Sequence, residues 1–121
     1  MEEMNINSDE TQRLIASDKV EGTAVYNGKG DRLGSIRNFM VDKVSGEVEY
    51  AVLSFGGFMG MGTDSYPLPW DVLDYDTGQG GYVVDLDKDM LDQAPHYRAD
   101  QAPSFNAAYG QEIRNYYAPL T

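Results

Sequence analysis

The sequence lacks cysteine and contains a single histidine, His96. Without cysteine the chain can form no disulfide, no thiolate nucleophile and no zinc–thiolate site, and a single histidine excludes a multi-histidine metal centre. Cationic residues are also few, since 9 lysines and arginines stand against 20 aspartates and glutamates, for a net charge of −11. This charge argues against binding to phosphate backbones, which depends on Lys and Arg, and against docking on an anionic membrane.

Long apolar runs are absent as well. No stretch approaches the ~18 apolar residues that a membrane-spanning helix needs. The first ten residues, MEEMNINSDE, are acidic and lack the basic-then-apolar order of a secretory signal. We therefore expect a soluble, cytoplasmic protein. Its 121 residues suit one domain, in which folding buries roughly two-thirds of the surface of the unfolded chain.

The middle of the sequence alternates short β-rich runs with Gly, Asn and Asp turn signals, which is typical of a small all-β barrel or sandwich. Gly22, Gly34 and Gly56 lie inside or at the ends of these runs and predict the bends by which a small sheet closes. The predicted fold class is therefore all-β, a small, strongly bent antiparallel β-barrel. Its five β-rich runs are residues 20–26, 33–41, 47–55, 66–75 and 82–86.

Turn residues predict how the first runs are connected. The first run ends at Asn27-Gly28, a dipeptide that tolerates the positive φ angles of tight hairpin turns. In the next connection Asp42 can accept hydrogen bonds from backbone N–H groups, and Gly46 can adopt the left-handed conformation. Residues 42–46 therefore predict a hairpin between the second and third runs.

Prolines and helix signals organise the second half of the chain. Pro67 and Pro69 cannot donate to a β-ladder, so the fourth run predicts an edge strand or a bent corner. Asp87 predicts the N-cap of a short helix that extends to about Gln93, and residues 109–117 predict two helical turns within an extended tail. We therefore expect three parts, which are a polar arm (residues 1–17), the barrel domain (18–95) and an aromatic C-terminal tail (96–121).

The order of several short motifs resembles the PRC-barrel family, which takes its name from the barrel of the photosynthetic reaction centre H subunit. The resemblance covers roughly residues 17–95 and implies a small, strongly bent β-barrel that serves mainly in binding and scaffolding. Known relatives include the H subunit, a domain of a ribosome maturation factor and many stand-alone proteins. The motifs are Gly22-Thr23-Ala24-Val25-Tyr26, Leu33-Gly34-Ser35-Ile36, Val41-Asp42, Ser45-Gly46, Tyr50-Ala51-Val52-Leu53, a Gly-rich loop and Pro69-Trp70.

No motif in the sequence predicts catalysis. The Gly-rich segment 56–63 lacks the Gly-Lys-Ser/Thr ending of a P-loop. The acidic stretches that begin at Asp74 and Asp85 lack the glycine and the glutamate that an EF-hand loop needs at its sixth and twelfth positions. His96 follows a proline in a predicted loop, and we interpret it as a solvated or capping residue. We therefore predict no catalytic residue, no cofactor and no metal site, and thus no enzyme.

The function that these features favour is a non-catalytic interaction module that forms a homodimer and offers an acidic surface to a protein partner. Direct contact with nucleic acid or insertion into a membrane is not expected. The apolar Gly-rich loop suits either a partner contact or packing within the chain. The resemblance implies two alternatives, an accessory protein of a photosynthetic or other electron-transfer membrane complex and a factor in ribosome assembly. The predicted interaction surface comprises Phe58, Met59, Met61, Tyr66, Trp70, Tyr116 and Tyr117.

Overall fold

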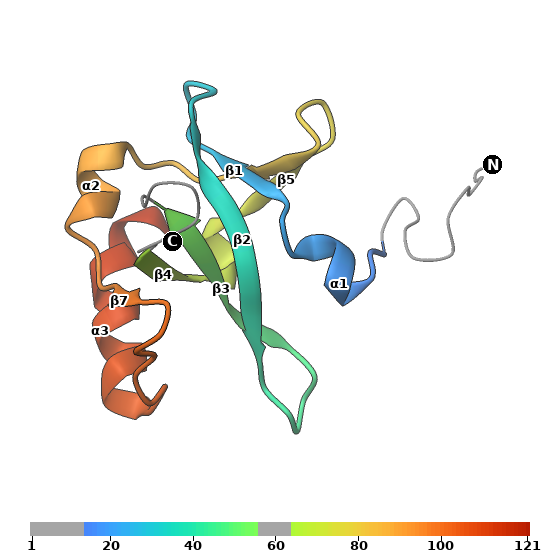
Figure 1. Ribbon diagram of the computed structural model, residues 1–121. Helices are drawn as coiled ribbons and strands as arrows, with labels where there is room; N and C mark the ends of the chain where they lie inside the picture. Colours follow the sequence, from blue (N-terminus) through green and yellow to red (C-terminus); the bar gives the residue numbers. More distant parts are fainter. Residues whose placement is uncertain (1–13, 56–63) are drawn as a thin grey trace.

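The computed structural model describes residues 14–55 and 64–121, and within them the chain forms a seven-stranded sheet with helices beside it (Figure 1). The strand order across the sheet is β5-β6-β1-β2-β3-β4-β7. The strands are β1 (Ala24–Tyr26), β2 (Arg32–Val41), β3 (Val48–Phe55), β4 (Asp64–Pro69), β5 (Asp74–Asp76), β6 (Gly81–Val83) and β7 (Tyr97–Arg98). The helical elements are α1 (Ser17–Val20), η1 (Trp70–Val72), α2 (Lys88–Asp92), α3 (Ala107–Tyr117) and η2 (Ala118–Leu120).

The sheet is mixed and open, whereas the sequence predicted a closed antiparallel barrel. Strands β1 to β4 form an antiparallel meander, β7 pairs with β4, and the β5–β6 hairpin joins the other end through a parallel pairing of β6 with β1. In the described residues β5 and β7 end the strand order and do not pair with each other. A parallel pair needs a long connection, which the intervening strands supply. Residue periodicity indicates where strands lie but not which strands pair.

Two close approaches between strands explain glycines within the sheet. A Cβ atom on Gly34 of β2 would lie 2.1 Å from the carbonyl oxygen of Ser54, and one on Gly81 of β6 would lie 2.6 Å from the carbonyl oxygen of Ala24. Both distances are far shorter than any real Cβ contact. Glycine at these two positions therefore allows β2 to approach β3 and β6 to approach β1.

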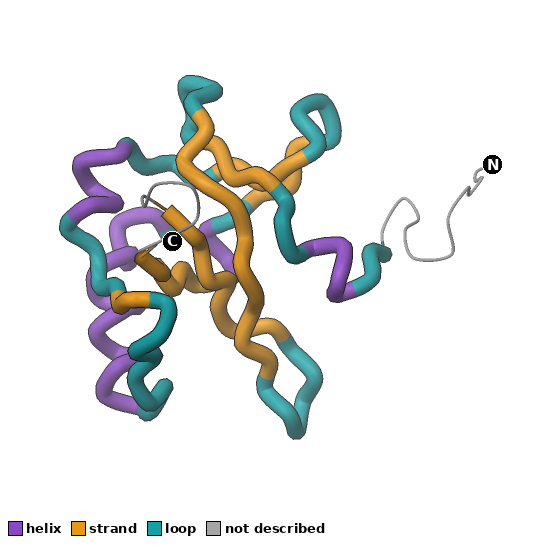
Figure 2. Tube along the Cα trace, in the orientation of Figure 1, coloured by secondary structure: helices purple, strands orange, loops and turns teal. Residues whose placement is uncertain are grey.

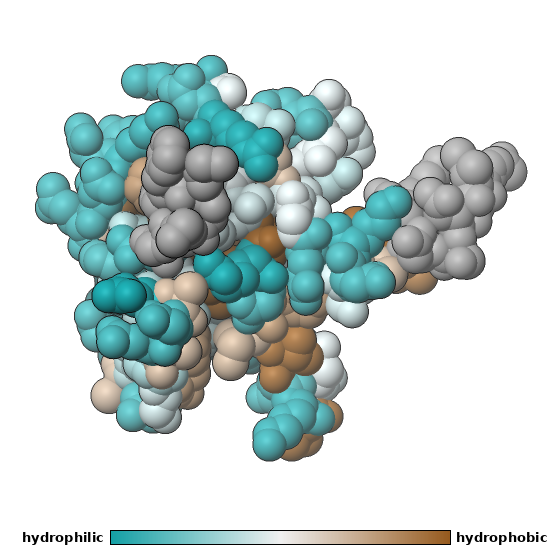
Figure 3. Space-filling view, in the orientation of Figure 1, coloured by the Kyte–Doolittle hydropathy of each residue, from teal (hydrophilic) through white to brown (hydrophobic). Residues whose placement is uncertain are grey.

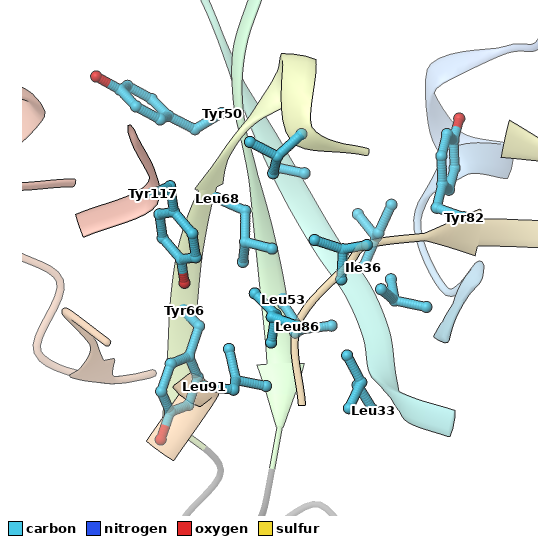
Figure 4. Close-up of a cluster of buried hydrophobic side chains, with 14 of the residues drawn as sticks. Leu33, Ile36, Tyr50, Leu53, Tyr66, Leu68, Tyr82, Leu86, Leu91 and Tyr117 are labelled. Carbon is cyan, nitrogen blue, oxygen red and sulfur yellow. The ribbon is translucent and has the colours of Figure 1, made fainter. Parts of the chain in front are cut away.

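The two faces of β3 and β4 are both buried. Residues that pair directly across antiparallel strands point to the same face, so Ile36, Leu53 and Tyr66 share one face, which we call the inner face. Tyr50 and Val52 alternate with Leu53 along β3 and lie on the opposite, outer face. All five residues are buried. The inner-face side chains converge in the hydrophobic core, together with side chains from β1, β6 and the segment around α2 (Figure 4).

Helix α3 covers the outer face at the Tyr50 end of β3. A Cβ atom on Gly110 would lie 2.7 Å from the Tyr50 hydroxyl, so glycine allows the helix to lie against this ring. The guanidinium of Arg114 lies 5.4 Å from the centroid of the Tyr50 ring and 3.3 Å from the Glu49 carboxylate. Ile113 is fully buried. Figure 1 and Figure 2 show α3 and α2 next to each other at the end of the sheet that carries β4 and β7.

Both predicted helices are present with side-chain caps. The Asp87 carboxylate accepts a hydrogen bond from the Met90 N–H at 2.9 Å at the start of α2, and Asn106 Oδ1 accepts one from the Tyr109 N–H at 2.9 Å at the start of α3. These bonds satisfy N–H groups that the first helical turn leaves without an intrahelical partner. Among the described residues no helix is long and apolar enough to cross a membrane.

The fourth predicted run is divided rather than continuous. Residues 66–75 contain the later part of β4, then η1, then the first residues of β5. β7 pairs only with Asp64 and Ser65, so the half of β4 that carries Pro67 and Pro69 has no described strand on its outer edge. The missing N–H groups of the two prolines are tolerated at such an edge. The predicted bent corner follows at η1, directly after Pro69.

Candidate functional site

The residues of the predicted interaction surface lie in different places. Phe58, Met59 and Met61 fall outside the described residues. Tyr66 is 3% exposed and Tyr117 is 1% exposed, so both side chains are enclosed by the protein's own core. Figure 4 shows the Tyr117 ring beside β4 with its hydroxyl directed toward Tyr66. Both tyrosines are therefore core residues and do not present a contact surface.

The buried tyrosine hydroxyls are neutral groups. The hydroxyls of Tyr109 and Tyr117 are buried and have no hydrogen-bond partner among the described residues. Burial raises the pKa of Tyr109 to about 12, with smaller contributions from Tyr97 and Glu112, and burial likewise raises the pKa of Tyr117. Loss of solvent disfavours the charged phenolate in both cases. These side chains therefore stay protonated near neutral pH, and no described residue accepts a hydrogen bond from either hydroxyl.

Trp70 belongs to a row of aromatic rings that crosses β2, η1, β5 and β6. Its ring centroid lies 6.5 Å from that of Phe39 and 5.5 Å from that of Tyr82, and Tyr82 lies 5.2 Å from Tyr75. The contacts of Tyr82 with Trp70 and Tyr75 are edge-to-face, a favourable arrangement for aromatic pairs. Trp70 is half-buried and packs against the core, so its ring links the β5–β6 hairpin to β2.

Tyr116 lies in a different region and joins α3 to α2. Its hydroxyl donates a hydrogen bond to the carbonyl oxygen of Met90, and its ring packs edge-to-face against Tyr117 with centroids 5.1 Å apart. Tyr116 is half-buried. The structure therefore places Trp70 and Tyr116 with separate groups of neighbours.

An open groove lies between α3 and the segment that connects α2 to β7. Its volume is about 980 Å³, within the ~300–1,000 Å³ range of ligand pockets. The apolar part of the wall comes from both sides of the groove and comprises Ala94, Pro95, Ala108, Tyr109 and Tyr116. The polar part comprises Gln93, His96, Gln111, Glu112 and Asn115.

His96 occupies a defined position in this groove, although the sequence assigned it no specific contact. Its ring stacks on Tyr66 with centroids 4.8 Å apart, and its Nδ1 lies 2.8 Å from the carbonyl oxygen of Ala94. A carbonyl oxygen only accepts, so Nδ1 is the donor in this hydrogen bond. The short spacing Ala94-Pro95-His96 is the only sequence signal for this arrangement, and it is too common to identify a site.

The most exposed apolar side chains of the β2–β3 hairpin form a second surface. Val44 is 96% exposed and Val41 is 45% exposed. The hairpin projects away from the rest of the sheet (Figure 1), and Figure 3 shows hydrophobic residues near its end among hydrophilic ones. The turn is held by Asp42, whose carboxylate accepts from the N–H groups of Val44 and Ser45 at 2.8 and 2.9 Å. The sequence predicted the turn but did not indicate that its exposed valines form a surface.

In the two described ranges no group of three or more His, Asp or Glu side chains is placed to hold a metal ion. Three of the five polar side chains that line the groove are amides, and burial keeps the Tyr109 phenol protonated. What the arrangement offers is surface for contact, namely an apolar hairpin end and a groove with polar edges.

Fold and surfaces together define a small domain built on a bent β-sheet and bordered by two helices, with surfaces suited to contact. Residues 13–91 match the PRC-barrel domain family, and the chain belongs to this family. It is also 31% identical over 83 residues to an uncharacterized protein of Deinococcus radiodurans. That alignment covers 69% of this chain but 29% of the relative. The chain therefore spans less than a third of the length of the protein that it matches.

Proposed function

We propose that the protein is a non-catalytic PRC-barrel interaction module that self-associates as a homodimer through the end of the β2–β3 hairpin. The observation that carries this proposal is the exposure of Val41 and Val44 on a hairpin that projects from the fold. Exposed apolar groups on a projecting element mark contact sites. In a twofold contact the same surface of both copies meets, so Val41 and Val44 of each copy lie in the interface.

The size of the contact suggests a weak dimer. Four valine side chains at about 1.5 kcal/mol each contribute about 6 kcal/mol before the costs of association. Two copies also repel each other because each carries a net charge of −11. Without those costs, about 6 kcal/mol would correspond to a dissociation constant of about 40 µM, so the expected dissociation constant is weaker, in the millimolar range. Salt screens the repulsion but not the apolar contact, so association should strengthen as ionic strength rises.

The test is a mass measurement by sedimentation velocity over a range of concentrations, at low and at high salt. Val44→Asp should leave a monomer because it removes an apolar group from the contact and adds a charge. Ser104→Asp is the matched control, since it adds the same charge at an exposed position outside the hairpin. A parent protein that stays strictly monomeric at about 1 mM, where a dimer of millimolar affinity is substantially populated, overturns self-association. Equal effects of both variants overturn the assignment to the hairpin.

A further inference from the structure

We infer that the groove between α3 and the α2–β7 segment binds a short, extended, cationic peptide segment of a partner protein. This inference deepens the proposed interaction role and concerns a surface separate from the hairpin. Every residue that lines the groove lies between positions 93 and 116, whereas the family match ends at residue 91. The groove is thus built by a part of the chain that the match to the family does not include.

Charge favours a cationic occupant. Glu112 is the one carboxylate among the lining residues, and it forms no ion pair with another described residue. Two further carboxylates act on the same region, since burial and then the charges of Asp64 and Asp92 raise the pKa of Tyr66, the ring on which His96 stacks. A cationic side chain in the groove would therefore meet an excess of negative charge.

Two arginines near the groove are already engaged. The Arg114 guanidinium pairs with Glu49 and lies over Tyr50, on the side of α3 that faces the sheet. The Arg98 guanidinium lies 3.5 Å from the Asp100 carboxylate, and Arg98 pairs with Asp64 in the register of β7 and β4. Neither arginine lines the groove. The charge of Glu112 is therefore left for a ligand to neutralise.

Polar groups at the edge suit an extended backbone. Gln111 and Asn115 are one helical turn apart, and the Gln111 side chain donates to Asn115 Oδ1 at 2.8 Å. An amide–amide bond of this kind uses one donor and one acceptor, whichever way the two amides are oriented, and leaves donors and an acceptor free. A peptide group offers the complementary C=O and N–H. The His96 ring lines the opposite side of the groove.

The apolar wall suits side chains of moderate size. Pro95 and the rings of Tyr109 and Tyr116 line the groove, and aromatic-lined grooves are a recurrent way to bind extended, proline-containing peptides. The two alanines, Ala94 and Ala108, leave room beside these rings. An extended peptide that alternates cationic and apolar residues would match the wall and the charge together.

The test measures the fluorescence anisotropy of a labelled peptide made of three Arg-Leu-Pro repeats, with the full chain as the binding partner. Glu112→Gln should raise the dissociation constant about threefold, the effect of one exposed charge pair. Ala108→Trp should remove measurable binding because it fills the groove without changing charge. Two matched controls, Glu47→Gln on the hairpin and Ala102→Trp in an exposed loop, should bind like the parent protein. Circular dichroism checks that each variant is folded.

Several results overturn the inference. A peptide with Gln in place of Arg that binds equally well refutes cation recognition, and equal weakening by Glu47→Gln shows general attraction to an acidic protein. Unchanged binding to Ala108→Trp places the peptide elsewhere. If Ala108→Trp instead dissociates a dimer, a second copy occupies the groove and the inference fails. If the parent protein is monomeric and binds the peptide, the peptide inference holds and self-association is wrong. If the parent protein is a dimer and binds no peptide, self-association holds and the peptide inference is wrong.

Discussion

Replacement of Gly34 by alanine tests the close approach of β2 to β3, on which the sheet depends. The new Cβ atom would lie 2.1 Å from the carbonyl oxygen of Ser54 and 3.2 Å from Leu53 Cδ1. An ordinary carbon–oxygen contact is about 3.3 Å, so the strands would have to separate by about 1 Å. A shift of that size lengthens inter-strand hydrogen bonds beyond their normal range of about 2.7–3.2 Å.

The expected loss of stability is about 3 kcal/mol. Overpacking in a closely packed region costs about 1–3 kcal/mol, and each weakened hydrogen bond costs about a further 1 kcal/mol. With a denaturant dependence of about 1.5 kcal/mol per molar urea, the unfolding midpoint of Gly34→Ala should fall by about 2 M. The fluorescence of Trp70, the single tryptophan, reports the transition because this ring packs against the core.

Gly28→Ala is the matched control. A Cβ atom there meets only Asp85 Oδ1 at 3.8 Å, an ordinary contact, and the backbone is not in the left-handed region. Its effect should stay within about 0.5 kcal/mol. If Gly34→Ala is no more destabilising than Gly28→Ala, β2 and β3 do not approach as closely as the structure has them, and the explanation of this glycine is wrong.

Two further predictions concern the pH dependence of stability. Hydrogen bonds from the Ser45 and Val44 N–H groups lower the pKa of Asp42 below 3.8 in the folded protein, so the stabilising effect of its carboxylate is present above that value and is lost as pH falls through the lower folded pKa. Asp42→Asn should therefore reduce the loss of stability that urea unfolding measures in acid. An unchanged acid profile would contradict this reasoning. Burial raises the pKa of Tyr109 from 10.0 to about 12, so its contribution is present below 10 and is lost as pH rises to about 12. Tyr109→Phe should flatten that alkaline decline of stability without destabilising the protein at neutral pH, because the Tyr109 hydroxyl makes no hydrogen bond with another described residue. A marked loss of stability at neutral pH would show that the hydroxyl does make a hydrogen bond.

The C-terminal helix shapes both the fold and the groove. Ile113 and Tyr117 are buried to the same degree as residues of the sheet, although both lie beyond the family match. The opposite side of the same helix supplies Gln111, Glu112 and Asn115 to the groove. One helix therefore closes the outer face of β3 and β4 and presents polar groups to solvent.

The local sequence predicted the elements whose causes are local. Asp42 and Gly46 indicated the β2–β3 turn, in which the Asp42 carboxylate accepts two N–H bonds and Gly46 has a φ of +81°. Asp87 indicated the start of α2. The first turn was predicted less well, because Gly30, and not Gly28, has positive φ there, while Asn27 Oδ1 accepts from two N–H groups of the loop.

Family membership, the β-rich core, the main turns and both short helices followed from the sequence by itself, because turn chemistry, capping and alternation act over a few residues. Only the tertiary structure decided that β6 pairs in parallel with β1, that the sheet stays open, and that Tyr66 and Tyr117 are enclosed while Val44 is exposed. It also decided that His96 and Glu112, 16 positions apart in the sequence, line one groove. The physical reason is that pairing and burial depend on which surfaces meet when distant segments pack, and the spacing of residues along the chain does not encode that choice.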